Sequence, residues 1–212
     1  MYTPPAFVVD DKSEIHAMMR ACRIATFITA TEEGPVATPL PMLIDADEGE
    51  SGTLYAHLAR PNPQWQIPVL GDGLAVFMGP DAYVTPTWYA AKAEHGKVVP
   101  TWNYTAVEAK GPVEFFDDPA RLLDIVKRLT ELHEGETANP WSVADAPPAF
   151  IGAQLRGIVG IRMPISRLTG KRKLSQNRSE ADRTGVRTGL LESRRPSDRA
   201  IAGMIPGPSS SS

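Results

Sequence analysis

Apolar residues recur at three- and four-residue spacing in two stretches of the chain, and each stretch predicts a helix. The first helix starts at Ser13 and ends near residue 23, and the second covers residues 119–135. Asp118 precedes the second helix and Gly135 ends it. The apolar positions are Ile15, Met18, Met19 and Cys22 in the first helix and Leu122, Ile125, Val126, Leu129 and Leu132 in the second.

Alternating or continuous apolar runs between Gly, Pro and acidic residues predict strands. These runs cover residues 24–30, 36–44, 53–59, 74–78, 82–85, 104–115 and 157–168. The first two form a hairpin, and Pro39 and Pro41 indicate that its second strand lies at a sheet edge or is bulged. Residues 79–81 are interpreted as a turn and residues 92–97 as part of a longer loop.

Shorter helical patterns follow in the second half of the chain. Residues 149–155 and 178–192 have helical composition, the latter weakened by Gly185 and Gly189, and Pro196 starts a final short helix. Strands clustered in the middle favour a mainly β fold, a small antiparallel barrel with helical additions. We expect a barrel domain over 1–170, a basic helical extension over 171–205 and a disordered tail over 206–212.

Composition limits the classes of protein that fit. The 212 residues contain one cysteine, Cys22, which excludes an intramolecular disulfide and favours a reducing compartment. Four dispersed histidines give no metal-ligand spacing, so no metal site is expected. The start lacks a signal-peptide pattern and no run is long enough for a membrane span, which predicts a cytoplasmic chain without membrane contact.

The formal net charge of −3 is unevenly distributed. Residues 156–199 hold twelve Lys and Arg and four acids, a net charge of +8, which leaves −11 for the remainder. Such a basic segment fits an anionic ligand or partner, and it equally fits ion pairing with the acidic part of the chain or of a second subunit.

Common catalytic signatures are missing from the sequence. There is no G-x-G-x-x-G, H-E-x-x-H or G-x-S-x-G pattern, and Cys22 on an apolar helix face is interpreted as a small core residue. Covalent catalysis therefore has no candidate nucleophile.

Aromatic and amide side chains gather in three segments, residues 57–65, 83–89 and 99–104. Flat apolar walls and a few polar groups suit a planar heteroaromatic ligand, and the turn at residues 60–62 could supply backbone amides and a cation for a phosphate. Core and dimer-interface packing explains the same aromatic residues. The basic run at 165–178 is interpreted as a loop that either holds an anion or is simply solvated.

These segments together resemble the PaiB family of FMN-binding negative transcriptional regulators. The matching blocks are M-Y-x-P-x-x-F at 1–7, HLARPNPQW at 57–65, G-P-x-A-Y-V at 79–84 with W-Y at 88–89, VPTWNY at 99–104, and LSQNR at 174–178 with D-R at 182–183 and Gly185. The resemblance runs to about residue 190. Thr169 and Pro61 depart from the expected pattern, and Pro61 removes an amide donor at the phosphate turn.

The resemblance implies a six-stranded antiparallel split β-barrel that forms a homodimer with FMN between the subunits. Arg60 is expected at the phosphate, and the ring is expected against residues of the later segments. The FMN-binding residues implied are His57, Arg60, Asn62, Trp65, Thr85, Trp88, Trp102, Asn103, Tyr104, Lys173, Gln176 and Asn177. Flavin chemistry needs no protein nucleophile, because the cofactor carries the electrons.

Three functions fit this sequence. The resemblance favours a flavin-binding, cytoplasmic transcriptional regulator whose basic C-terminal segment contacts DNA, although residues 178–192 make a poor recognition helix. A flavin-dependent oxidoreductase acting on a small molecule is the alternative, by analogy with the fold class. A barrel that binds no flavin and serves as an interaction module is the third.

Overall fold

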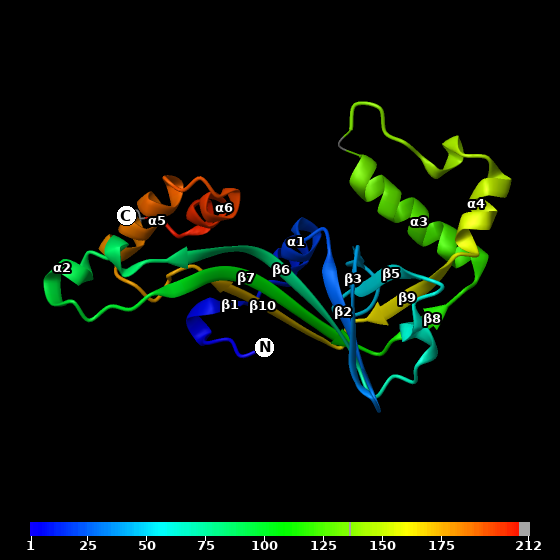
Figure 1. The fold of residues 1–212 in the computed structure, drawn as a ribbon, viewed down its shortest axis with the longest axis horizontal. Coiled ribbons are helices and arrows are strands. Elements are labelled where there is room, and N and C mark those ends of the chain that lie inside the picture. The colour runs from blue at the N-terminus through cyan, green and yellow to red at the C-terminus, as the bar shows by residue number, and fades with distance from the viewer. Residues whose placement is uncertain (136, 208–212) are drawn as a thin grey trace. The chain divides into compact units, whose positions relative to one another are not determined.

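The computed structural model describes residues 1–135 and 137–207. Its strands are β1 Val8–Val9, β2 Ala25–Thr31, β3 Gly34–Leu40, β4 Leu43–Asp45, β5 Thr53–Ala59, β6 Gly73–Val84, β7 Thr101–Gly111, β8 Glu114–Phe116, β9 Ile158–Pro164 and β10 Arg167–Lys173 (Figure 1). Its helices are α1 Lys12–Ala21, α2 Ala91–His95, α3 Pro119–Glu134, α4 Pro148–Leu155, α5 Glu180–Leu191 and α6 Pro196–Met204. Four 3₁₀ turns join them: η1 Pro5–Phe7, η2 Pro63–Gln66, η3 Pro86–Trp88 and η4 Val143–Asp145.

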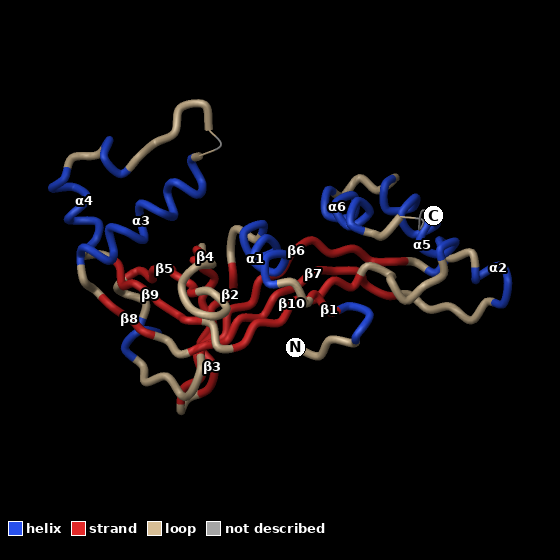
Figure 2. The backbone as a smooth tube through the Cα atoms, turned by 180° about the vertical axis from the view of Figure 1, so that it is seen from behind, coloured by secondary structure: helices blue, strands red, loops and turns tan. Residues whose placement is uncertain are grey.

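The strands form two sheets. The order is β1-β10-β7-β6-β2-β3 in the six-stranded sheet and β4-β5-β9-β8 in the four-stranded sheet, and the neighbours whose register is resolved run antiparallel. Figure 2 shows the strands and helices along the backbone. A mainly antiparallel β fold with helices is therefore confirmed. The described residues build a six-stranded and a four-stranded sheet that do not close, so the finer expectation of a six-stranded split barrel stays a prediction.

The chain divides into two compact units. Unit 1 contains residues 1–15, 78–107 and 169–212, and unit 2 contains residues 16–77 and 108–168. The basic segment from residue 171 onward belongs to unit 1, together with the outer parts of β6 and β7. Of the tail predicted at 206–212, residues 208–212 lie outside the described part of the chain. No described helix combines the length and apolar character that crossing a membrane requires.

Proline positions explain the hairpin in unit 2. Pro39 pairs with Thr26 of β2, and β3 is the last strand of its sheet, so the predicted edge position is confirmed. The expected strand over 36–44 was wrong in its length. Strand β3 ends at Leu40, before Pro41. The residues that follow form the separate strand β4, which pairs with β5 in the other sheet.

Helix α3 covers part of the four-stranded sheet in unit 2. The Asp118 side chain caps it by accepting a hydrogen bond from the Arg121 backbone N–H at 2.9 Å. Its apolar stripe forms a buried cluster with residues of β8 and α4. The buried members are Phe116, Leu122, Ile125, Leu129 and Leu155. The predicted helix and stripe are confirmed, except that Leu132 is exposed.

The core of unit 1 lies between the strands and helices α5 and α6. Figures 1 and 2 show both helices on one side of this part of the sheet and the N-terminal segment on the other. The buried members of this core are Ala82, Val84, Tyr89, Leu174, Val186, Leu190, Ile201, Ala202 and Ile205. Helices α5 and α6 therefore cover one face of these strands. The other face carries the side chains that alternate with the buried ones along each strand.

The two glycines that weaken the helical pattern of α5 have a packing role. A Cβ at Gly189 would collide with the indole of Trp88, and a Cβ at Gly185 would collide with the Trp88 backbone carbonyl. Both glycines thus let η3 approach α5 closely. The packing at this contact outweighs the helix propensity that the two glycines cost.

Several expected boundaries were wrong. The turn predicted at 79–81 is part of the continuous strand β6, and Gly79 is required because a Cβ there would strike the Thr105 side chain. The strand expected over 104–115 is β7 and β8, separated at Pro112. The loop expected around 92–97 contains the short helix α2. Cys22, expected on the first helix, lies just after the end of α1 and is half-buried.

The last expected strand, over 157–168, was also wrong, since it is two strands, β9 and β10. The basic run interpreted as a loop forms β10, which pairs with β1 and lies beside β7. Gly170 allows this pairing, because a Cβ at that position would meet Val9 and Ile15. The basic side chains of this run are therefore held on a strand.

Candidate functional site

One sheet face in unit 1 gathers aromatic rings and lysines, and we call it the aromatic–lysine face. It faces away from α5 and α6 and consists of Val8, Tyr83, Trp102, Tyr104, Lys171 and Lys173. Strand alternation explains the grouping, because Val8 pairs with Lys171 and residues two apart share a face. Ala82 and Val84, the neighbours of Tyr83 on β6, are buried on the opposite face.

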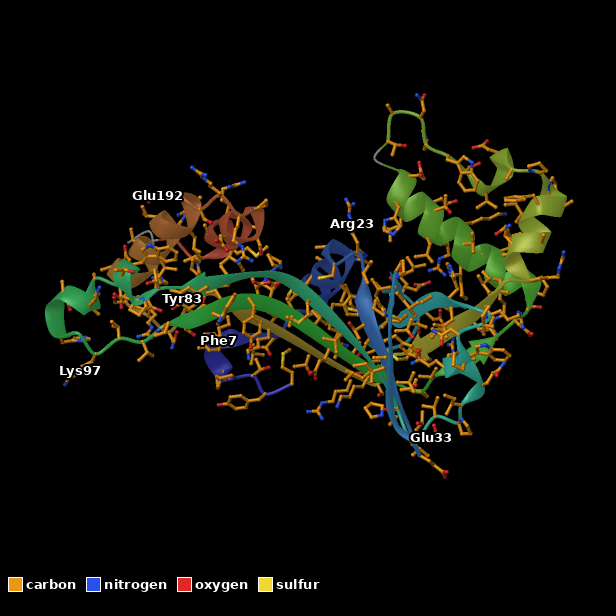
Figure 3. All side chains as sticks on the ribbon, in the orientation of Figure 1. Phe7, Arg23, Glu33, Tyr83, Lys97 and Glu192 are labelled. Carbon is orange, nitrogen blue, oxygen red and sulfur yellow. The ribbon has the colours of Figure 1, made fainter. Side chains whose placement is uncertain are left out.

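The rings of this face contact one another and remain accessible. Tyr83 and Trp102 meet edge to face with ring centroids 5.6 Å apart, and their exposed fractions are 45% and 48%. Tyr83 is labelled on β6 in Figure 3. Large exposed aromatic rings are unusual on a solvated strand and indicate a surface that binds something.

The two lysines are anchored to backbone and hydroxyl oxygens. Lys171 Nζ donates to the Tyr2 carbonyl at 3.1 Å and lies 5.0 Å from the centroid of the Tyr104 ring. Lys173 Nζ donates to Thr101 Oγ1 at 2.5 Å and to the Trp102 carbonyl at 2.6 Å. Lys171 is only 7% exposed, which is rare for a lysine without a carboxylate partner.

The electrostatics of the face favour an anion. Burial lowers the pKa of Lys173, and the positive charges of Lys171 and Arg178 lower it further. Within residues 1–135 and 137–207, neither Lys171 nor Lys173 forms an ion pair with an acid, whereas Arg172 on the other side of β10 pairs with Glu14. A bound anion would supply the missing countercharge for both lysines.

In unit 2, the turn at the end of β5 holds the predicted phosphate residue Arg60. Its Nε donates to the Arg156 carbonyl at 2.7 Å, its Nη2 donates to the Ile158 carbonyl at 3.1 Å, and its Nη1 lies 3.5 Å from Asp117. Its guanidinium lies 5.8 Å from the Trp65 ring centroid, and Trp65 Nε1 donates to the Arg60 carbonyl at 3.0 Å. Arg60 and Trp65 are therefore brought together, with three donor groups of Arg60 already directed at protein oxygens.

Asn62 organises the rest of this turn. Its side-chain oxygen accepts from the Gln64 N–H at 3.0 Å, and its Nδ2 donates to Thr38 Oγ1 at 3.1 Å. Gln64 is fully buried and bonds Thr38 and Thr29. The backbone N–H groups of Arg60 and Asn62 donate to carbonyls. Because these amides are engaged and Pro61 has none, the expected cradle of free backbone amides at residues 60–62 is absent.

The other predicted residues of unit 1 mostly serve the internal structure. Asn103 is buried and its Nδ2 donates to Ser175 Oγ at 3.0 Å, on the side opposite Trp102. Gln176 accepts from the Leu174 N–H and donates to the Arg172 carbonyl, which closes the turn after β10. Thr85 caps η3, and Trp88 packs on α5.

Two of the predicted residues are less constrained. Asn177 is exposed in the turn after β10. His57 is half-buried on β5, burial lowers its pKa, and its buried Nδ1 has no hydrogen-bond partner among the described residues. Its imidazole is thus held in the neutral form near neutral pH.

The structure adds Lys171, Tyr83 and Val8 to the predicted members of the face, which were Trp102, Tyr104 and Lys173. The signal in the sequence was the two-residue spacing of Lys171 and Lys173, although Arg172 between them is also basic. Interpreting the run as a loop concealed it, since only a strand places Lys171 and Lys173 on one side.

Comparison with known proteins settles the family. The family model described as "Putative FMN-binding domain" matches residues 1–167. The chain belongs to this family. Over 206 residues it is 30% identical to the "Protease synthase and sporulation protein PAI 2" of Bacillus subtilis (strain 168), covering 97% of this chain and 96% of that protein. The predicted membership of the PaiB family and the FMN cofactor are thereby confirmed.

Solved structures agree on the fold. The chain is similar to the FAD and heme binding protein from Mycobacterium smegmatis, with a TM-score of 0.57, 13% identity, and coverage of 78% of this chain and 73% of that one. It is also similar to the flavocytochrome Anf3 from Azotobacter vinelandii, with a TM-score of 0.55, 14% identity, and coverage of 78% and 68%. At these identities the likeness concerns the fold alone.

The aromatic–lysine face fits FMN in its chemistry. The phosphate of FMN needs cations that are not already neutralised, and Lys171 and Lys173 meet that need. The flat isoalloxazine ring needs accessible aromatic walls, which Tyr83 and Trp102 provide. The turn at Arg60 offers one anchored guanidinium with a nearby carboxylate.

Proposed function

We propose that this protein is an FMN-binding homodimer that acts as a negative transcriptional regulator, with FMN held on the aromatic–lysine face. Lys171 and Lys173 contact the phosphate, and Tyr83 and Trp102 contact the ring. The observation that carries the assignment is the pair of lysines without an acidic partner beside accessible rings. Arg60, the phosphate ligand expected from the sequence, is the competing position.

When bound, FMN supplies the electron-transfer chemistry of its isoalloxazine ring. The chain's own residues bind and orient the cofactor. The ammonium group of Lys173 is preorganised by Thr101 and the Trp102 carbonyl, so little side-chain entropy remains to be lost on binding. Trp102 and Tyr83 are already in contact, and they would exclude water from one side of the ring.

A second copy of the chain is the proposed cover of this face. Tyr83, Trp102 and Val8 expose apolar surface on one side of one sheet, and burial of such a patch stabilises an association. A homodimer would bury these rings and enclose the flavin. Size-exclusion chromatography with light scattering tests the proposed homodimer. A monomeric mass at micromolar concentration would contradict it.

The regulatory role is supported by the relative and by the charge distribution. The name of the Bacillus subtilis relative refers to protease synthase and sporulation, and that relative aligns along nearly the whole chain. Within the basic segment, four arginines of α5, α6 and their connection are exposed: Arg187, Arg194, Arg195 and Arg199. We propose that they contact DNA phosphates, as part of a regulator that works in the cytoplasm. Retention of promoter DNA should then fall steeply as salt increases.

FMN titration of matched variants tests the site. Lys173→Ala should weaken FMN binding by about 10- to 150-fold, the effect of losing a charged hydrogen bond of about 1.5 to 3 kcal/mol. Trp102→Ala should weaken it and alter the flavin absorption band, because a stacked ring is lost. Arg23→Ala, an exposed cation of unit 2 labelled in Figure 3, is the control and should bind as the parent does.

The competing position gives the refuting result. If Arg60→Ala abolishes binding while Lys173→Ala leaves it unchanged, the phosphate lies at the turn after β5 and the assignment to the aromatic–lysine face is wrong. Because Arg60 also anchors two carbonyls, thermal unfolding of that variant must be compared with the parent. Oxidation of NAD(P)H by the FMN-loaded protein would instead favour the oxidoreductase alternative.

A further inference from the structure

Helices α3 and α4 border an open-sided cavity within unit 2, and none of its lining residues belongs to the aromatic–lysine face or to the turn at Arg60. The two helices lie side by side in Figure 1 and share the buried cluster of Leu122 and Leu155. The cavity measures about 570 Å³, and η4 closes its third side. Its apolar wall is formed by Leu123, Val143, Ala146, Pro148, Ile151 and Leu155.

This volume lies in the range of small-molecule sites, which is roughly 300 to 1,000 Å³. Three segments of one unit form it, so a compact ligand can be surrounded on several sides. The lining is apolar except for Lys127, which lies one helical turn from Leu123 on the same side of α3.

Charge determines which small molecules fit. Lys127 forms no ion pair or hydrogen bond with any residue in the described part of the chain. An adjoining cavity of about 410 Å³ shares Pro119, Gly152 and Leu155 with the first and adds Arg60, Arg156 and Asp117. Arg60 and Arg156 donate to backbone carbonyls, and Arg60 lies 3.5 Å from Asp117, so Lys127 is the cation that remains for a ligand of this mainly apolar space. Such a space is complementary to an apolar molecule with one negative charge.

We propose that this cavity binds a small apolar monoanion, such as a medium-chain or aromatic carboxylate. The hydrocarbon part lies between α3 and α4, and the carboxylate is held at Lys127. The driving force is burial of apolar surface, and the single cation selects for charge. This site is separate from the aromatic–lysine face, so failure of the FMN assignment to that face leaves it standing.

Gly152 allows the cavity to be filled without strain. It lies in α4 and lines both cavities, and a Cβ there would meet nothing within 4 Å. Gly152→Leu should therefore occupy the space while raising the helix propensity of α4. Gly203 of α6 is the matched control, because it is an exposed helical glycine in unit 1 that also has open space around it.

The experiment uses the full chain saturated with FMN and the fluorescent monoanion anilinonaphthalene sulfonate as probe. The parent and Gly203→Leu should bind one equivalent saturably, and Gly152→Leu should bind at least about tenfold more weakly, since the apolar contacts of the ligand are lost. Decanoate should displace the probe. Lys127→Gln should weaken decanoate binding about threefold and leave binding of neutral decanol unchanged, as expected for an exposed charge.

Two results would overturn the proposal. One is equal probe affinity in Gly152→Leu and Gly203→Leu, and the other is equal loss of decanoate and decanol in Lys127→Gln. Circular dichroism melting of each variant excludes unfolding as the cause. FMN affinity is measured in parallel, and it should be the same in Gly152→Leu as in the parent.

Discussion

Replacing Gly185 by Ala tests how closely η3 packs against α5. In an ordinary helix interior this substitution stabilises by about 1 kcal/mol, because alanine loses less backbone entropy on folding. At Gly185 the new methyl group would collide with the backbone carbonyl of Trp88. A backbone atom cannot rotate away as a side chain can, so we assign the upper part of the 1 to 3 kcal/mol range for overpacking, about 3 kcal/mol. The net expectation is a loss of about 2 kcal/mol.

For a chain of this length, 1 kcal/mol shifts the melting temperature by about 2 to 4 °C. Gly185→Ala should therefore lower the midpoint by about 4 to 8 °C in circular dichroism or differential scanning fluorimetry. Gly203→Ala is the control, because its Cβ meets open space and the variant should melt at or slightly above the parent temperature. If both variants were stabilised alike, Trp88 would not lie against α5 and the packing argument would be wrong.

Three further predictions concern unit 2 and the aromatic–lysine face. Asn62→Ala should destabilise the protein by about 1 to 2 kcal/mol in urea unfolding, because the η2 cap and the bond to Thr38 are lost together. Gly160→Ala should lower the melting temperature, since its methyl group would enter the Phe116 ring, whereas the open Gly203→Ala should not. Because burial lowers the pKa of Lys173, the fraction of charged Lys173 falls as pH rises through that lowered value. FMN affinity measured from pH 7 upward should decline in the parent earlier than in Lys173→Arg, and parallel curves would contradict the assigned role of Lys173.

The elements that the sequence predicted well are those whose signals are local. Residues 53–59 alternate within a bounded run, and α3 has a cap, a stripe and a terminal glycine, so their limits were recovered almost unchanged. Pro39 indicated an edge strand because a missing N–H excludes a central position. In each case the information lies within a few residues of the element itself.

The elements that were misplaced depend on distant contacts. Gly79-Pro80-Asp81 has the composition of a turn, but Gly79 is there to admit Thr105 of the next strand. Gly185 and Gly189 lower the helix propensity of their segment. Both are nevertheless required, because Trp88, about a hundred residues earlier, packs where a Cβ would lie. A glycine that makes room for a neighbour and a glycine that makes a turn are indistinguishable until the neighbour is known.

The same limit applies to the candidate site. Arg60 lies in a segment that contains Trp65, whereas Lys173 lies in a basic run without aromatic residues, and neither pattern shows which cation is free of protein partners. The structure separates them by their hydrogen-bond partners. Arg60 directs donors at two carbonyls and lies near Asp117, whereas Lys171 and Lys173 have only neutral oxygen partners.

This difference predicts how each position responds to the removal of a nearby negative charge. Removing the carboxylate with Asp117→Asn should strengthen anion binding only if Arg60 is the phosphate ligand, because Asp117 lies 3.5 Å from its guanidinium. If Lys173 is the ligand, the affinity for FMN should remain that of the parent. A rise in FMN affinity in Asp117→Asn would therefore place the phosphate at Arg60, and the effect should shrink as salt screens the partly exposed pair.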